Sequence, residues 1–203
     1  STYAKLHEKS VTIMGVPKTI DNDLCLTDHT PGFGSAAKYI ATTLQEIAYD
    51  TSIYPLPSVT IVEIMGRDAG WLTGAATLAR TDYGLGPDLI YLPEVDFNME
   101  EFLADVSDIY AKNKNCIVAV SEGIHYPDGT FVSEAKTSAT DGFGHAQLGG
   151  LAALLANVVK EQTGAKVRGI ELSLLQRCGA HVASGTDIAE SYLAGKTAVE
   201  AAV

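Results

Sequence analysis

Short apolar runs rich in β-branched residues alternate along the chain with longer segments of helical periodicity. The runs predict strands at residues 11–16, 59–65, 88–92, 116–120 and 167–175. The segments between them predict helices at residues 36–50, 71–79, 99–112, 147–162 and 181–194. Residues 123–136 are rich in turn formers, and their PDGT sequence predicts a hairpin. This alternation is typical of an α/β fold, with a doubly wound, largely parallel sheet and helices on both faces.

The composition supports a folded core and disfavours two classes of partner. Of the 203 residues, 46% are hydrophobic and 19% are charged, which excludes disorder of the whole chain. The 14 basic and 25 acidic residues give a net charge of −11, so nucleic acid is not expected as a partner. No apolar run reaches the roughly 18 residues of a membrane span, and residues 1–10 do not resemble a signal peptide. We therefore expect no membrane association.

Cysteine usage and the chain ends give two further expectations. Cys25, Cys116 and Cys178 are too far apart in the sequence for a CxxC motif, which indicates reduced thiols and a cytoplasmic protein. The chain does not begin with Met, and its last residues stop inside a helical pattern. We expect residues 1–203 to be a single fragment of a larger protein, with a soft boundary near residues 20–30.

Ligands of doubly wound sheets bind where the carboxyl ends of strands meet helix N-termini. The first such place holds Lys18, Thr19, Asp21 and Asp23 in one dense polar loop. Phosphoryl transfer to an alcohol needs a base, positive charge and alignment, and Asp21, Lys18 and Thr19 would supply them. Asp23 would tune the base or lie in the outer shell of a metal. A solvated turn explains the same residues.

Three later strands also end in polar clusters. Met65, Gly66 and Arg67 follow the second strand, where a glycine admits a ligand to the backbone and an arginine fork suits phosphate. Glu122 follows the fourth strand and would accept hydrogen bonds from sugar hydroxyls. Two arginines flank the end of the last strand and could both reach a phosphate: Arg168 and Arg177. Each of these charged residues could instead be an exposed or salt-bridged surface group.

These segments together resemble the phosphofructokinase family. GVPKTIDNDL resembles its catalytic loop and MGRDAGW its sugar-phosphate loop, while VSEGI and LLQR match two further substrate-binding segments in the same order. The resemblance covers residues 11–195 and implies a phosphotransferase that converts fructose 6-phosphate to fructose 1,6-bisphosphate in glycolysis. It also implies a homodimer or homotetramer in the full-length protein.

The resemblance implies a role for each matched residue. Asp21 would be the base that deprotonates the sugar 1-hydroxyl, assisted by Thr19 and Asp23. Arg67 would stabilise charge on the transferred group. The remaining matched residues would bind the sugar phosphate: Met65, Gly66, Glu122, Arg168 and Arg177.

Lys18 bears on the phosphoryl donor. Lysine at this position is similar to the pyrophosphate-dependent members, where it contacts the donor, although some ATP-dependent members carry it too. Leu174 replaces a histidine that many members have, and this also fits the pyrophosphate type. Ser58 stands where many short ATP-dependent enzymes have an arginine that reaches the neighbouring subunit.

The family's Gly-Gly-Asp donor loop is absent from these residues. We expect it, and with it the Mg²⁺ ligand, upstream of residue 1, so the isolated chain is expected to lack turnover. The leading hypothesis is a pyrophosphate-dependent enzyme. The alternatives are an ATP-dependent 6-phosphofructokinase and a sugar-phosphate-binding fragment without catalysis.

Overall fold

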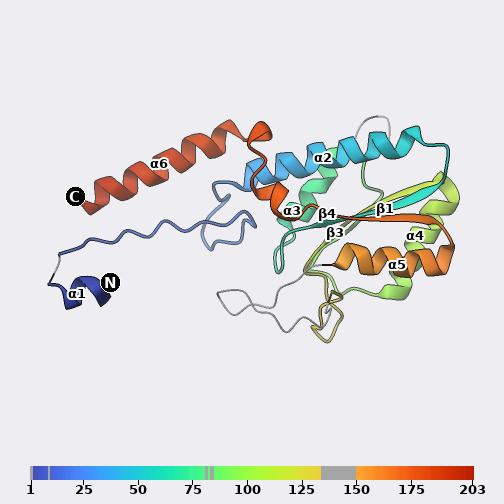
Figure 1. Cartoon of the computed structure of the whole chain (residues 1–203), viewed down its shortest axis with the longest axis horizontal. Coiled ribbons are helices and arrows are strands. Elements are labelled where there is room, and N and C mark those ends of the chain that lie inside the picture. Colours follow the sequence, from blue (N-terminus) through green and yellow to red (C-terminus); the bar gives the residue numbers. More distant parts are fainter. Residues whose placement is uncertain (1, 9, 81, 83–84, 134–149) are drawn as a thin grey trace.

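In the part of the chain that the structure describes, four parallel strands form one sheet in the order β2-β3-β1-β4 (Figure 1). The strands are β1 (Ser58–Ile64), β2 (Leu89–Tyr91), β3 (Asn115–Ser121) and β4 (Lys166–Glu171). The computed structural model describes residues 2–8, 10–80, 82, 85–133 and 150–203. The two central strands β1 and β3 are buried along almost their whole length, which accounts for their nearly unbroken apolar sequences.

Helices cover both faces of this sheet (Figure 1). On one face, α4 (Met99–Asn113) and α5 (Leu151–Thr163) pack against Val59 and Ile61 of β1. On the other, α2 (Phe33–Ile53), α3 (Trp71–Gly74) and the 3₁₀ helix η1 (Ala75–Ala79) pack against Val62 and Ile64. Alternate residues of β1 thus enter two separate cores, as the pleat of a strand requires.

The ends of the chain extend away from the sheet. The short helix α1 (Thr2–Leu6) is followed by an extended segment, and in Figure 1 this segment and α6 (Gly185–Ala202) both project from the same end of the sheet. After β4 come two short 3₁₀ helices, η2 (Ser173–Arg177) and η3 (Ala180–Val182). Asp187 in α6 ties this region to α2, because its Oδ2 accepts hydrogen bonds from the backbone N–H (2.5 Å) and the hydroxyl (2.6 Å) of Ser35.

The structure confirms the α/β class, the parallel sheet and helices on both faces. It also confirms the turn near PDGT, where His125 and Phe131 form an antiparallel bridge. The predicted helices at 71–79 and 181–194 are present, but each is divided between a 3₁₀ and an α-helical part. Residues 134–136 of the predicted turn segment and 147–149 of the predicted helix lie outside the described residues. No helix in the described ranges is both long and apolar enough to cross a membrane.

Two strand predictions are wrong in whole or in part. Residues 11–16 form no strand, and Val11, Ile13 and Met14 are exposed, because no described strand runs beside them to pair with. The predicted strand at 167–175 ends at Glu171, and the chain turns there into η2. Ser173 adopts a left-handed conformation (φ 43°) that a strand cannot contain.

Candidate active site

The polar segments that follow the strands enclose one pocket with the loop before α2. The pocket has a volume of about 450 Å³ and is lined by Lys18, Thr19, Ile20, Asp21, Asp23, Met65, Arg67, Asp68, Glu122 and Arg177. It therefore brings together nearly all the residues that the sequence singled out. Segments up to about 160 residues apart in the chain meet here because parallel strands present their carboxyl ends at one edge of the sheet.

Gly66 holds the turn between β1 and Arg67. Its N–H donates to Glu122 Oε1 (3.3 Å), and its carbonyl accepts from the Ser121 hydroxyl (2.5 Å). Its φ of 129° suits only glycine, and a Cβ there would also collide with the backbone carbonyl of Ala69. The strand end of β3 thus fixes both polar groups of Gly66 and places Arg67 at the pocket.

Gly123 serves the same turn from the other side. The backbone carbonyl of Arg67 lies directly over its Cα, so any side chain at this position would overlap the peptide of Arg67. Gly123 N–H also lies 3.2 Å from the Ser121 hydroxyl. The prediction from VSEGI concerned Glu122 alone. Ser121 and Gly123, on either side of Glu122, support the turn that carries Arg67. Their position next to Glu122 was the only sign of this role in the sequence.

The Asp21 loop is held by short-range side-chain hydrogen bonds. Thr19 Oγ1 accepts from the Asp21 N–H at 3.0 Å, which fixes the backbone that carries the carboxylate. Asn22 has a left-handed conformation (φ 59°), and its Oδ1 accepts from the Thr30 N–H at 2.9 Å. These bonds link the loop to the residues just before α2. The Asp21 carboxylate is thereby kept in the pocket.

Burial raises the pKa of both carboxyl groups at the centre of the pocket. For Asp21 the nearby Asp23 adds to this effect, and the charges of Lys18 and Arg67 oppose it. For Glu122 the hydrogen bond from Gly66 and the charge of Arg67 oppose the effect of burial. A carboxylate with a raised pKa is a stronger proton acceptor, which suits Asp21 to general base catalysis.

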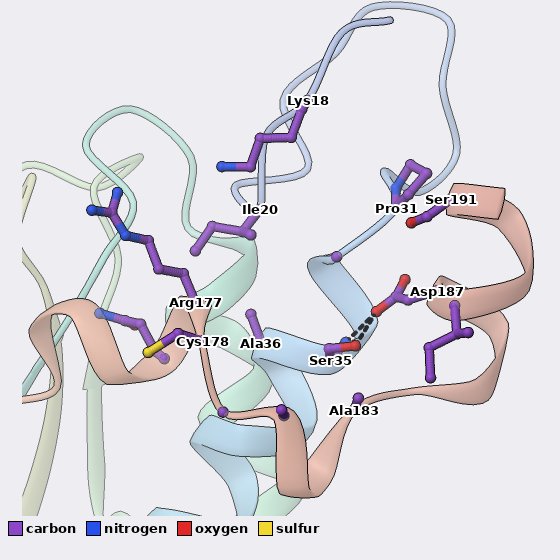
Figure 2. A pocket seen from close by; sticks show the side chains of 15 residues that line it. Lys18, Ile20, Pro31, Ser35, Ala36, Arg177, Cys178, Ala183, Asp187 and Ser191 are labelled. Atoms are coloured by element: carbon purple, nitrogen blue, oxygen red, sulfur yellow. Dashed lines mark hydrogen bonds between the residues drawn. The ribbon is translucent and has the colours of Figure 1, made fainter. Parts of the chain in front are cut away.

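Arg177 lines this pocket and also a neighbouring one of about 490 Å³. Figure 2 shows Lys18, Ile20 and Arg177 on one side of the neighbouring pocket, and Pro31, Asp187 and Ser191 on the other. Lys18 and Arg177 therefore form a basic border that the two pockets share.

Arg168 lies elsewhere. It is in β4, exposed, and its Nη1 is 3.2 Å from Asp50 Oδ2 in α2. Arg168 is not among the residues that line the candidate pocket. Its role as a phosphate ligand stays a prediction.

The described residues offer no group of three or more His, Cys, Asp or Glu side chains that could hold a metal ion. Asp21 and Asp23 could face a metal in the pocket, but they do not make a complete site. The residues in hand therefore do not fit a whole Mg²⁺ site, and we derive no step through the ion.

Glu63 is a buried carboxyl group that lines a small cavity together with Met65 and Glu122, and it is not among the residues predicted from the sequence. Its side chain projects from β1, is 5% exposed, and accepts a hydrogen bond from the Ala152 N–H (2.8 Å) at the start of α5. Burial raises the pKa of Glu63 to about 7, although that hydrogen bond opposes the shift; the charges of Glu171 and Glu122 raise it further. A glutamate inside the apolar run VTIVEIM was the visible signal.

The raised pKa of Glu63 predicts a pH-dependent stability. The folded state favours the protonated form of Glu63. The stabilisation that this group gives the folded state is therefore fully present below pH 4.5 and is lost as the pH rises through about 7. Glu63→Gln keeps an acceptor for Ala152 and removes the charge. We expect the difference in free energy of unfolding, variant minus wild type, to be about 2 kcal/mol larger at pH 8 than at pH 5.

Urea unfolding at several pH values measures this difference. The exposed Glu46 of α2 provides the matched control, since Glu46→Gln removes one carboxylate without changing a buried group. A difference between Glu63→Gln and wild type that stays constant from pH 5 to pH 8 would contradict the prediction.

A family model described as "Phosphofructokinase" matches residues 1–202. A pyrophosphate--fructose 6-phosphate 1-phosphotransferase of Halomonas elongata is 44% identical over 195 residues, which are 95% of this chain and 46% of that protein. Its counterpart in Xanthomonas campestris pv. campestris is 46% identical over 205 residues, covering 100% of this chain and 49% of the relative.

The solved structures agree with the sequence matches. The crystal structure of a pyrophosphate-dependent phosphofructokinase from Marinobacter aquaeolei superposes with a TM-score of 0.77 at 40% identity. The match covers 98% of this chain and 46% of the other. The chain thus spans about half the length of the curated relatives it matches.

Proposed function

This chain belongs to the phosphofructokinase family, and we propose that it is the sugar-phosphate-binding part of an enzyme that uses pyrophosphate to phosphorylate fructose 6-phosphate. The product is fructose 1,6-bisphosphate. The observation that carries the proposal is the pocket itself, which places Asp21 together with the cations Lys18, Arg67 and Arg177. The names of the relatives support the choice of substrates.

The proposed chemistry assigns the proton and the charge to separate groups. Asp21 accepts the proton of the sugar 1-hydroxyl while the oxygen of that hydroxyl attacks a phosphorus of pyrophosphate. The new O–P bond forms while the bridging P–O bond breaks, and inorganic phosphate leaves. Lys18 and Arg67 neutralise the oxygens of the transferred group, since such transition states depend mainly on positioning and electrostatics.

Two other residues of the same pocket, Arg177 and Glu122, bind the sugar phosphate. The Arg177 guanidinium suits the 6-phosphate, and the Glu122 carboxylate accepts hydrogen bonds from sugar hydroxyls. Met65 and Gly66 contact the sugar phosphate from the turn that Ser121 and Glu122 hold. We place the protein in the cytoplasm and in glycolysis, as a homo-oligomer, because these properties accompany the proposed activity.

Two measurements test the proposal. Isothermal titration of the 203-residue chain with fructose 6-phosphate tests the sugar-phosphate site, with fructose as the control ligand that lacks the phosphate. Steady-state kinetics of the full-length protein with pyrophosphate and with ATP test the donor. We expect binding of fructose 6-phosphate but not of fructose, and turnover with pyrophosphate. Faster turnover with ATP would overturn the donor, and binding without turnover by either donor would favour a non-catalytic protein.

A further inference from the structure

Gln176 is a buried residue with no part in the chemistry proposed above. It is 2% exposed and lies in η2, immediately before Arg177. Its Oε1 accepts a hydrogen bond from the Met65 N–H at 3.2 Å, and its Nε2 donates to the Ser173 carbonyl at 3.0 Å. One side-chain amide therefore connects the segment that carries Arg67 to the turn that carries Arg177.

This connection is needed because the pairing of β1 with β4 stops before Met65. β1 pairs with β4 as far as Glu63 and Glu171, and Leu172 N–H then donates to the Glu63 carbonyl. The chain of β4 next leaves the sheet as η2, so no strand carbonyl remains on that side for Met65. Gln176 Oε1 takes the place of the missing carbonyl and satisfies a backbone N–H at the strand end.

Glutamine is the one common side chain that meets these demands. It accepts from one backbone group and donates to another at this reach, whereas asparagine is shorter and methionine does neither. Glutamate would lose the donor. It would also add a fourth carboxylate to a cavity of about 90 Å³ that Gln176 lines together with Glu63, Glu122 and Glu171. The site therefore requires a neutral amide.

We propose that Gln176 is a positioning residue that fixes residues 65–67 against η2 and thereby sets the spacing of Arg67 and Arg177. This inference rests on the proposed function, in which both arginines bind phosphoryl groups. In that function the sugar phosphate contacts Arg177 and the turn of Met65 and Gly66, which Gln176 holds together. Because these groups are already at a fixed spacing, they need no ordering when fructose 6-phosphate binds, and this preorganisation adds affinity. Loss of the amide leaves the Met65 N–H without its partner or displaces the turn.

The first test compares Gln176→Met with Gln45→Met, the same change at a half-buried glutamine of α2. Hydrogen exchange at the Met65 amide reports the bond, and isothermal titration with fructose 6-phosphate reports its consequence. In Gln176→Met we expect faster exchange at Met65 and a Kd higher by about tenfold. In Gln45→Met we expect neither change.

The second test uses Gln176→Glu as a variant that protonation restores. A protonated carboxyl offers one acceptor and one donor, as the amide does, whereas the carboxylate offers only acceptors. The titratable groups that face it are Glu63, Glu122 and Glu171, which the wild type also has. Its Kd relative to wild type should therefore fall by about tenfold or more from pH 8 to pH 5.5.

Three results would count against the inference. Wild-type affinity in Gln176→Met despite faster exchange at Met65 would show that the bond positions nothing. A lower melting temperature in both Gln176 variants, with no recovery of Gln176→Glu at low pH, would assign Gln176 to the fold alone. Failure of the wild-type chain to bind fructose 6-phosphate would instead overturn the proposed function, and the inference with it.

Discussion

Replacing Asp21 with asparagine is expected to lower turnover with pyrophosphate by about 100-fold or more, while the affinity for fructose 6-phosphate changes little. The substitution preserves the shape of the side chain and removes its ability to accept a proton. The sugar phosphate keeps its contacts with Arg177 and Glu122, which line the same pocket. Steady-state kinetics of the full-length protein, together with titration of the sugar phosphate, measure the two quantities.

Asp28 provides the control for this substitution. It is an exposed residue of the same loop whose side chain does not line the pocket, so Asp28→Asn should leave turnover unchanged. An unchanged turnover number in Asp21→Asn would exclude Asp21 as the base. A large loss of sugar-phosphate affinity would mean that Asp21 binds the substrate and does not act on it.

The central sheet was predictable because its strands are buried on both faces. Val59, Ile61, Val62 and Ile64 enter two different cores, and this double burial requires the continuous apolar run that the sequence shows. Residues 11–16 carry a similar pattern and form no strand. A run of β-branched residues favours extended backbone, but a strand also needs a neighbouring strand to pair with, and the local sequence does not show whether one is present.

The pocket was predictable from one topological rule. Arg67, Glu122 and Arg177 follow three of the apolar runs, and in a parallel sheet the carboxyl ends of the strands meet at one edge. Asp21 lies in the same pocket without a strand before it, because the neighbouring Ile20 is buried in the core that α2 helps to form. The rule does not reach Arg168, which lies within β4 beside Asp50.

The supporting contacts could not be predicted in the same way. Gln176 bonds to a backbone group 111 residues earlier, and the Ser121 hydroxyl bonds to one 55 residues earlier. The residue type alone does not predict these hydrogen bonds, because Gln and Ser are also common at exposed positions. The need for these bonds arises only where β4 leaves the sheet and where Gly66 turns, and both events are properties of the fold.

Replacing Lys18 with methionine is expected to lower pyrophosphate-driven turnover by about 100-fold, which corresponds to about 2.7 kcal/mol of transition-state stabilisation. Pyrophosphate has no nucleoside to anchor it, so its affinity must come from direct contacts with its oxygens. Lys18 lines the pocket beside Asp21, and its charge acts on that carboxyl. The ammonium would both bind the donor and offset the repulsion between the carboxylate and the phosphate.

The exposed Lys38 of α2 gives a matched control, because Lys38→Met removes one positive charge away from the pocket. Steady-state kinetics with pyrophosphate, and titration with fructose 6-phosphate, separate the two substrates. Binding of fructose 6-phosphate should barely change in Lys18→Met, since Arg177 and Glu122 are assigned to that substrate. A collapse of sugar-phosphate affinity with an intact response to pyrophosphate would place Lys18 on the acceptor side, and the choice of pyrophosphate as donor would lose its support from this chain's own residues.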